Sequence, residues 1–407
     1  MRAAARRADA ARRLAPRHDW VRADFFDLTE PAAWAPLLDG VDVVVNCVGV
    51  LQDGPGDSNQ IAHIDGPEAL IAAMQTHGPR RLVHLSAAGA DVEAGTDYAI
   101  TKARTEAMVE ASGLDWTILR PSLVLARASY GGTAMLRGLA AFPGFIPVMG
   151  GSQTFRPLAM ADLCACVVRL ASSNAGLART LDVGGPEIVD QATLLVALRG
   201  WLGLPRAPVL RVPSWAAWPA IKVGDALGRL GWASSFRTTS VRQMQYNAAG
   251  GSPVALEAET GVSPRTLDAI LADDPATTAD RWQARLYFVR PISIATLGVF
   301  WILTGLITLG PGFGTAQAHL LTAGFDPSSA WHGTFWGGAF DVVMGLALWV
   351  RRWTRIIAIL MVLATLGYLA GATVWAPQLW LDPLGPWLKV LPMMALCLFV
   401  AATDERR

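Results

Sequence analysis

Four long apolar segments follow one another in the part of this 407-residue chain that lies beyond Pro291. Their residues are Ile292–Leu309, Trp336–Val350, Ile356–Val374 and Leu384–Ala401. Each approaches or reaches the roughly 20 residues that a helix needs to cross a bilayer. Nine of the 16 tryptophans lie between Trp282 and Trp387, as expected for aromatic residues at the two membrane surfaces. These features predict an all-α domain of four transmembrane helices over residues 291–402.

Basic residues are distributed unevenly around these segments. No Lys or Arg occurs from Pro291 to Val350 or from Ile356 to Trp387. Arginines cluster instead before the first segment, between the second and third, and at the end: Arg281, Arg285, Arg290, Arg351, Arg352, Arg355, Arg406 and Arg407. Because Lys and Arg accumulate on the cytoplasmic side, both ends of this domain are expected there. The first twenty residues contain no apolar signal segment. We therefore expect a multi-pass protein of a bacterial-type cytoplasmic membrane, with its N-terminal part in the cytoplasm.

Residues 1 to about 190 alternate short β-branched runs with Ala-rich stretches, which is typical of βα units. The predicted strands are Trp20–Ala23, Val41–Val48, Arg81–Leu85, Trp116–Leu119 and Thr180–Val183, and the predicted helices are Glu30–Leu38, Gln60–Thr76 and Tyr98–Ala111. Several strands are apolar on both faces, which favours a sheet covered on both sides. We predict a Rossmann-type, doubly wound parallel sheet within residues 1–255, including an irregular substrate-side region at 205–255. A linker over 256–290 would follow.

Charge and cysteine usage give no indication of a nucleic-acid partner or of a metal site. The net charge is only +1, and the basic residues near the start are not interleaved with aromatic ones, so a nucleic-acid partner is not expected. Cys47, Cys164, Cys166 and Cys397 form no CxxC pair and have no nearby histidine cluster, so no metal site is predicted.

The pair Tyr98 and Lys102 carries the sharpest chemical signal. Residues four apart share a face of a helix, so the phenol and the ammonium would project together. A nearby ammonium favours phenolate and is expected to lower the pKa of the tyrosine, which would make it a useful acid and base near neutrality. Ser86 follows the apolar run 81–85 at the carboxyl edge of a strand, where open α/β sheets place their ligands. The predicted catalytic residues are therefore Ser86, Tyr98 and Lys102.

Motifs around these residues resemble those of the extended and atypical short-chain dehydrogenases. They are Asp24 after a strand, Asn46-Cys47-Val48-Gly49, His84-Leu85-Ser86, Tyr98-x-x-x-Lys102 and Leu119-Arg120-Pro121-Ser122. The chain is most similar to the NmrA-like branch that includes the nucleotide-binding accessory subunit of respiratory complex I, over roughly residues 1–250.

The resemblance implies a set of cofactor contacts. Asp24 and its neighbour Phe25 would meet the adenine. Asn46, Cys47, Val48 and Gly49 would line the adenosine ribose. Lys102, beside Tyr98, would hold the nicotinamide ribose, and Arg120 and Pro121 would border the nicotinamide.

The start of the chain departs from that family. A strand and a Gly-rich turn that receive the pyrophosphate are expected there, but residues 1–7 resemble the end of the second strand and the basic turn after it. Two explanations stay open: the reading frame begins too late, or the protein has lost strong nucleotide binding. In a complete fold, Arg6 and Arg7 would lie where a 2′-phosphate is recognised, which favours NADP over NAD.

The apolar half resembles the DoxX-like four-helix family, which is associated with quinone or thiol redox chemistry. Asp341 lies inside its second segment, and ionisable residues at such depth are often functional. The alternative is that Asp341 lies at shallow depth or pairs with a residue of another helix. Gly298 and Gly305 are interpreted as helix-packing positions.

We expect a membrane-anchored, NAD(P)-dependent oxidoreductase that acts on a carbonyl, hydroxyl or sugar-like small molecule near a quinone or lipid. An epimerase or dehydratase that retains its cofactor is a related possibility. The alternative is a non-catalytic, nucleotide-binding accessory or assembly protein of a respiratory membrane complex.

Overall fold

The computed structural model describes residues 1–407 except 55, 151–152, 173–177, 233–236, 246–249, 252, 382, 384 and 405–407. Arg406 and Arg407, which contribute to the predicted topology, lie outside the described residues. The chain divides into two compact units. The first comprises residues 1–226 and 233–284, and the second comprises residues 227–232 and 285–407.

The first unit contains the strands, and its central sheet is parallel. This sheet has four strands in the order β10-β5-β4-β3. A separate parallel pair is formed by β1 and β2. The strands are β1 Arg2–Ala5, β2 Asp19–Arg22, β3 Val43–Asn46, β4 Arg81–Leu85, β5 Asp115–Pro121, β6 Val124–Leu125, β7 Ile146–Met149, β8 Thr154–Phe155, β9 Leu158–Ala159, β10 Arg179–Val183, β11 Val189–Asp190 and β12 Val209–Val212. The predicted Rossmann-like sheet is therefore present as a four-stranded sheet and a separate pair.

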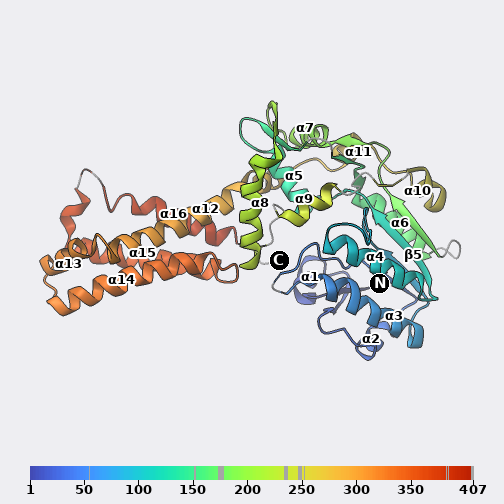
Figure 1. Ribbon diagram of the computed structural model, residues 1–407, viewed down its shortest axis with the longest axis horizontal. Helices are drawn as coiled ribbons and strands as arrows, with labels where there is room; N and C mark the ends of the chain where they lie inside the picture. Colours follow the sequence, from blue (N-terminus) through green and yellow to red (C-terminus); the bar gives the residue numbers. More distant parts are fainter. Residues whose placement is uncertain are drawn as a thin grey trace. The chain divides into compact units, whose positions relative to one another are not determined.

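Helices alternate with these strands (Figure 1). In order they are α1 Ala8–Leu14, α2 Pro31–Leu38, α3 Gly66–His77, α4 Asp97–Glu110, α5 Gly131–Ala140, α6 Met160–Ser172, α7 Gln191–Trp201, α8 Ser214–Arg229, α9 Thr238–Gln245, α10 Pro253–Thr260 and α11 Leu267–Asp273. A π-helical stretch over Ile61–Asp65 leads into α3, so the predicted helix 60–76 is continuous but not uniform. Helices α10 and α11 belong to the first unit, within the segment predicted as a linker.

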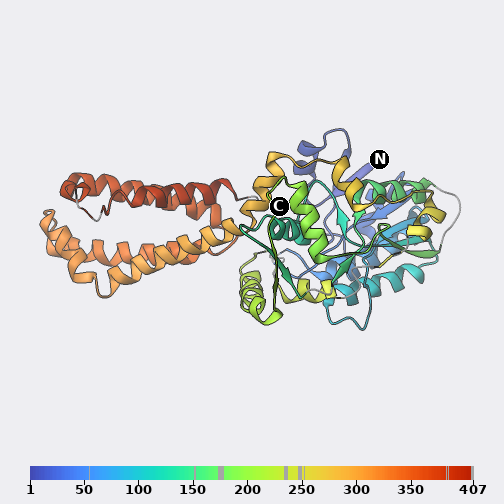
Figure 2. The same ribbon diagram turned by 90° about the horizontal axis from the view of Figure 1, so that it is seen from above.

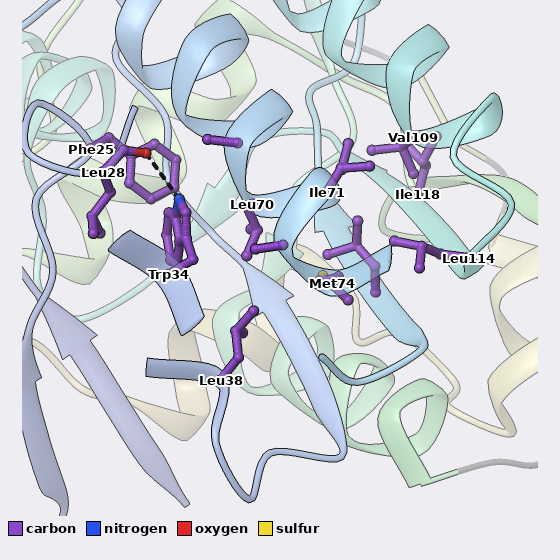
Figure 3. Packing of buried hydrophobic residues seen from close by; sticks show 13 residues of the cluster. Phe25, Leu28, Trp34, Leu38, Leu70, Ile71, Met74, Val109, Leu114 and Ile118 are labelled. Atoms are coloured by element: carbon purple, nitrogen blue, oxygen red, sulfur yellow. Dashed lines mark hydrogen bonds between the residues drawn. The ribbon is translucent and has the colours of Figure 1, made fainter. Parts of the chain in front are cut away.

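Both faces of the sheet are covered, because side chains alternate along each strand. Leu82 of β4 and Ile118 of β5 join a core with α2, α3 and α4, which Figure 3 shows from close by. Val83 and Leu119, one residue further along each strand, join a second core with α6 and α10. The central sheet is thus doubly covered, as the two-sided apolar strands predict.

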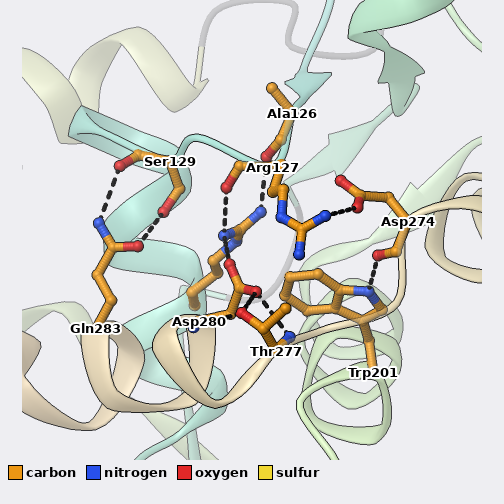
Figure 4. Close-up of polar contacts among 9 residues, drawn as sticks. Ala126, Arg127, Ser129, Trp201, Asp274, Thr277, Asp280 and Gln283 are labelled. Atoms are coloured by element: carbon orange, nitrogen blue, oxygen red, sulfur yellow. Dashed lines mark hydrogen bonds and ion pairs between the residues drawn. The ribbon is translucent and has the colours of Figure 1, made fainter. Parts of the chain in front are cut away.

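A buried ion pair fixes the polypeptide at the end of the first unit (Figure 4). The Arg137 guanidinium lies 3.3 Å from the Asp280 carboxylate and also donates to the carbonyl of Ala126 at 2.7 Å. Thr277 donates to the same carboxylate through its backbone N–H at 2.8 Å and its hydroxyl at 2.6 Å. A buried charge is costly unless it is paired and hydrogen-bonded, and these contacts meet that condition for Asp280.

The second unit is helical, and its helices are drawn in orange and red in Figure 2. They are α12 Thr278–Leu309, which begins in the first unit, α13 Phe313–Thr322, α14 Pro327–Leu348, α15 Thr354–Trp375, a 3-10 turn Pro377–Trp380, and α16 Val390–Ala402. Glycines bring α12 and α14 close together: a Cβ added at Gly345 would lie 2.7 Å from the carbonyl oxygen of Gly298. A Cβ at Gly338 would lie 3.2 Å from that of Gly305. The prediction that Gly298 and Gly305 pack helices is confirmed.

Two helices in the described part of the chain, α12 and α15, are long and apolar enough to cross a bilayer. Helix α14 has 22 residues but carries more polar side chains, including Asp341, and α16 has only 13 residues. At 1.5 Å per residue, α16 spans only about 20 Å. Of the four predicted spans, the structure supports two by length and composition. In the most apolar 18-residue stretch of each helix, 33% of the residues are buried in α12 and 22% in α15. A core helix of a soluble protein would be mostly buried.

Candidate functional site

The predicted catalytic residues meet at the carboxyl edge of β4. Ser86 follows β4, and its backbone N–H donates to the carbonyl of Leu119 on β5 at 2.7 Å. Helix α4 then begins beside this edge, with the Thr96 hydroxyl accepting from the N–H of Ala99 at 3.3 Å as a helix cap. Tyr98 lies in the first turn of α4, and Lys102 lies one turn later. The loop and helix therefore place all three residues near one end of the strands.

Lys102 is buried and holds two strand ends together. Its ammonium donates to the carbonyl of Val48 at 3.1 Å and to that of Leu85 at 3.0 Å. An ammonium has three donors, so one remains without an acceptor among the described residues. Burial lowers the pKa of Lys102 to about 8, and the nearby Glu106 partly opposes this effect. The side chain is still mostly charged at neutral pH.

The effect of this site on Tyr98 differs from the sequence-based expectation. Burial of the phenol raises the pKa of Tyr98 to about 12, with a smaller contribution from Tyr130 in the same direction. The expected lowering by Lys102 is wrong for this state of the protein, because desolvation of the phenolate outweighs the attraction of an ammonium that two carbonyls already engage. At neutral pH, Tyr98 is therefore a proton donor.

Ser86 supplies a second polar group at the same edge. Its hydroxyl is buried and has no hydrogen-bond partner among the described residues. Buried hydroxyl groups are almost always satisfied, so an unpartnered one indicates a place where a ligand or water binds. This observation agrees with the predicted role of Ser86 toward a substrate oxygen.

The turn after β3 is built around Asn46. The Asn46 side-chain carbonyl accepts from the N–H of Val48 at 3.0 Å, and its amide donates to Nδ1 of His84 at 3.3 Å. Gly49 completes the turn beside Lys102, since a Cβ at this position would lie 3.4 Å from Nζ. Cys47 is exposed within the same turn. The predicted group of residues 46–49 thus lies together, next to Lys102.

His63 is a site residue that the sequence analysis missed. Its Nε2 accepts from the N–H of Val50 at 3.0 Å, so its proton must reside on Nδ1, which donates to the hydroxyl of Thr101 at 2.8 Å. Its ring packs edge-on against Tyr98, with 5.6 Å between centroids. Burial, followed by the charge of Lys102, lowers the pKa of His63 to about 3. The histidine is therefore neutral and joins the turn after β3 to α4. It lies in the middle of a helical segment, where nothing in the sequence marks it.

The predicted adenine-side residues lie at the ends of β1 and β2. The Asp24 carboxylate accepts from the N–H of Phe26 at 3.2 Å in a local turn. The Phe25 ring packs in the core against Trp34, at 5.3 Å between centroids, so its side chain is engaged in packing. Arg6 donates to the Asp57 carboxylate at 2.8 Å and to the carbonyl of Gly56 at 2.7 Å. Arg7 occupies the position just before the first residue of α1, and its carbonyl accepts from the N–H of Ala11 at 3.0 Å.

Arg120 and Pro121 end strand β5. The Arg120 guanidinium binds the buried Glu106 carboxylate with two contacts, one of them 2.9 Å from Nε to Oε1. This ion pair raises the pKa of Arg120. Pro121 aligns with Val183 of β10, and its carbonyl accepts from the N–H of Ala88 at 3.2 Å. Arg120 thus binds Glu106, which lies one turn beyond Lys102 on α4. Only part of the Arg120 side chain remains exposed for other contacts.

Comparisons with known proteins identify two domains in this chain. Residues 1–143 match a family described as NAD(P)H-binding, and residues 298–398 match the DoxX-like family. The chain is 22% identical over 214 residues to the mitochondrial NADH-ubiquinone oxidoreductase 40 kDa subunit of Neurospora crassa. That match covers 50% of this chain and 56% of the relative, so the chain spans little more than half of its relative's length.

Solved structures are similar to the chain at low sequence identity, and the first of the two below shares its fold. An NADPH-dependent quinone oxidoreductase from Escherichia coli, complexed with NADPH, is 19% identical, with a TM-score of 0.51 over 67% of this chain and 89% of that chain. An epimerase from Methanothermobacter thermautotrophicus is 12% identical, with a TM-score of 0.49 over 67% and 80%. The chain therefore consists of an NAD(P)H-binding Rossmann-type domain, similar to the 40 kDa subunit, joined to a C-terminal DoxX-like domain.

Proposed function

We propose that the protein is a membrane-anchored oxidoreductase that uses NADPH or NADH to reduce the carbonyl group of a small molecule. The observation that carries this proposal is the meeting of Tyr98, Lys102 and the unpartnered hydroxyl of Ser86 at one sheet edge. The remaining donor of Lys102, beside the turn at Gly49, fits a nicotinamide ribose next to it.

Each residue has a defined part in the proposed reaction. When bound, the nicotinamide cofactor supplies the hydride that adds to the carbonyl carbon. Ser86 donates a hydrogen bond to the carbonyl oxygen, and Tyr98 transfers its phenol proton to that oxygen as negative charge develops there. The Lys102 ammonium stabilises the resulting phenolate, which then regains a proton from water. The product is an alcohol.

The membrane part of the proposal rests on the second unit. Helices α12 and α15 are long, apolar and mostly unburied, and the family match covers them and α14. We propose four membrane-associated helices with the arginine-rich ends in the cytoplasm of a bacterial-type cell, where the nicotinamide nucleotide is available. A lipid-soluble carbonyl compound such as a quinone is the substrate class that this anchorage favours. The contacts of Arg6 with Gly56 and Asp57 leave the choice between NADP and NAD to experiment.

Replacing Tyr98 tests the proposal. The purified protein in detergent would be assayed for NADPH and NADH oxidation with a panel of quinones and aldehydes. Tyr98→Phe should lower turnover about 100-fold or more, the usual contribution of a general acid, without preventing nucleotide binding. Tyr287→Phe, which removes a phenol of α12, should retain activity. Nucleotide binding without turnover by the wild-type protein would instead support the second candidate.

That second candidate is a nucleotide-binding accessory protein without turnover. It is favoured by the two carbonyl contacts that engage Lys102 and by the likeness to a subunit of NADH-ubiquinone oxidoreductase. An epimerase would be distinguished from both by product formation without net oxidation of the nicotinamide.

A further inference from the structure

Helix α8 exposes large apolar side chains on one of its faces. Trp215, Trp218 and Val223 are 78%, 59% and 58% exposed. The opposite face, formed by Ile221, Gly224 and Gly228, is buried. A surface helix of a soluble protein normally shows the reverse pattern. A contiguous apolar patch of this kind marks an interaction surface.

The polar group on this face has the chemistry of a membrane boundary. Among the side chains of α8 that the structure describes, the exposed charged one is Lys222. Its ammonium lies 5.3 Å from the centre of the Trp218 ring in a cation–π contact. Tryptophan and lysine on one helix face are typical of helices that lie in the headgroup region of a bilayer.

The chain beyond α8 leads directly to the arginine-rich end of the apolar helices. Within the second unit, the Trp232 indole donates to the carbonyl of Trp349 at 2.7 Å, and the N–H of Arg351 donates to the carbonyl of Leu230 at 3.2 Å. The Arg351 guanidinium lies 5.4 Å from the Trp232 ring centre. In the proposed topology this end of the helices is the cytoplasmic membrane surface. Trp218 precedes the last residue of α8 by about 17 Å of helix, so chain connectivity keeps α8 near that surface.

We propose that α8 lies in the cytoplasmic headgroup layer of the membrane, with Trp215, Trp218 and Val223 toward the acyl chains. This membrane contact would be additional to that of the apolar helices, and the inference rests on the proposed membrane anchor. The occupant of the exposed face is the lipid bilayer, because the face combines large aromatic side chains with the exposed cation of Lys222 and continues into the membrane-proximal segment.

Hydrogen bonds connect α8 to the catalytic site. The Asp225 carboxylate accepts from Thr238 of α9, at 3.0 Å from its N–H and 2.6 Å from its hydroxyl. Helix α9 then contacts both loops beside Tyr98: Gln52 donates to the Ser240 hydroxyl at 2.6 Å, and Thr96 donates to Gln243 at 2.7 Å. A helix placed in the bilayer surface would therefore be linked through α9 to the loops beside Tyr98.

Photocrosslinking of the full-length protein in lipid nanodiscs tests the inference. A benzophenone amino acid would be placed singly at Trp215, Trp218 or Val168, the last being 62% exposed on α6 of the same unit. After irradiation, mass spectrometry would identify adducts. Phospholipid adducts at positions 215 and 218 should exceed those at 168 at least tenfold. A crosslinked dimer, or lipid adducts no more frequent than at 168, would overturn the inference.

A fourth position separates this inference from the proposed anchor. Leu303 of α12 is 52% exposed, and a benzophenone there should react with lipid if α12 crosses the bilayer. Lipid adducts at 303 without any at 215 and 218 would refute the role of α8 alone. Absence of lipid adducts at all of these positions would refute both the anchor and the interfacial helix. Neither readout depends on turnover.

Discussion

At the scale of single residues, burial lowers the pKa of the basic side chains at the site. His63 shows this most clearly, because both of its ring nitrogens are engaged and burial lowers its pKa to about 3. In the unfolded chain the same side chain titrates at about 6.5. The unfolded state therefore binds more protons than the folded state between these values, and folding stability must fall as the pH falls below 6.5.

This linkage predicts acid sensitivity of the first unit. Between pH 7 and pH 5, His63 alone should reduce the free energy of unfolding by about 2 kcal/mol. His63→Gln should flatten that dependence by a similar amount, as measured from urea unfolding in detergent. His18→Gln, which changes an exposed ring, should leave the slope as in the wild type. Equal slopes for all three proteins would contradict the buried, neutral state of His63.

Lys102 gives a prediction at the opposite end of the pH range. Burial lowers its pKa to about 8, so its positive charge is lost as the pH rises through that value. Carbonyl reduction needs this charge to stabilise the transient Tyr98 phenolate. The turnover rate should therefore decline above about pH 8, as measured with saturating nucleotide. A rate that stays constant to pH 10 would show that the Lys102 charge is not used.

Sequence reasoning located the residues of this site but not their protonation. The i and i+4 spacing of Tyr98 and Lys102 and the strand-end position of Ser86 suffice to place them together. Desolvation depends on side chains from distant segments, so the raised pKa of Tyr98 could not be predicted from spacing. The same spacing does extend to Glu106, a further four residues along α4, which could have been recognised as the partner of Arg120.

At the scale of elements, glycine positions decide how α12 and α14 approach. A methyl group added at Gly345 would meet the backbone carbonyl of Gly298 at 2.7 Å and the backbone nitrogen of Ile302 at 2.9 Å. Backbone atoms cannot move aside as a flexible side chain can, and overpacking of this kind costs about 1–3 kcal/mol. Gly345→Ala should therefore lower the thermal unfolding temperature of the second unit in detergent.

Gly337 provides the matched control on the same helix. Nothing lies within 4 Å of a Cβ added there. Gly337→Ala should leave the unfolding temperature unchanged or raise it slightly, since alanine favours a helix over glycine by about 1 kcal/mol. If both substitutions lowered it equally, close glycine packing would not be what joins these helices.

Element boundaries were predictable where local signals are strong. The predicted strand 81–85 coincides with β4, because an apolar run ends there at a polar loop. The fourth apolar segment was predicted to start at Leu384, which lies outside the described residues, whereas α16 starts at Val390. Gly385 has a φ of 56°, a left-handed conformation, and Pro386 follows it, so a helix cannot run through this point. Hydropathy alone does not reveal such breaks.

At the scale of the whole molecule, the arginine distribution predicts how the chain crosses the membrane. Arginines lie in the part of α12 before Pro291 and again after α14, whereas the segment from Pro291 to Val350 has neither Lys nor Arg. Since basic loops are retained in the cytoplasm, the loop between α12 and α14, with α13, should face the opposite side.

Reporter fusions in a bacterial host measure this topology directly. Alkaline phosphatase fused after Gly324 should be active, and the same enzyme fused after Arg355 should be inactive. A fluorescent protein that folds only in the cytoplasm should give the reciprocal result. Phosphatase activity after Arg355 would place the arginine-rich end outside, away from cytoplasmic nucleotide, and would be incompatible with a reductase that draws NADPH or NADH at the first unit.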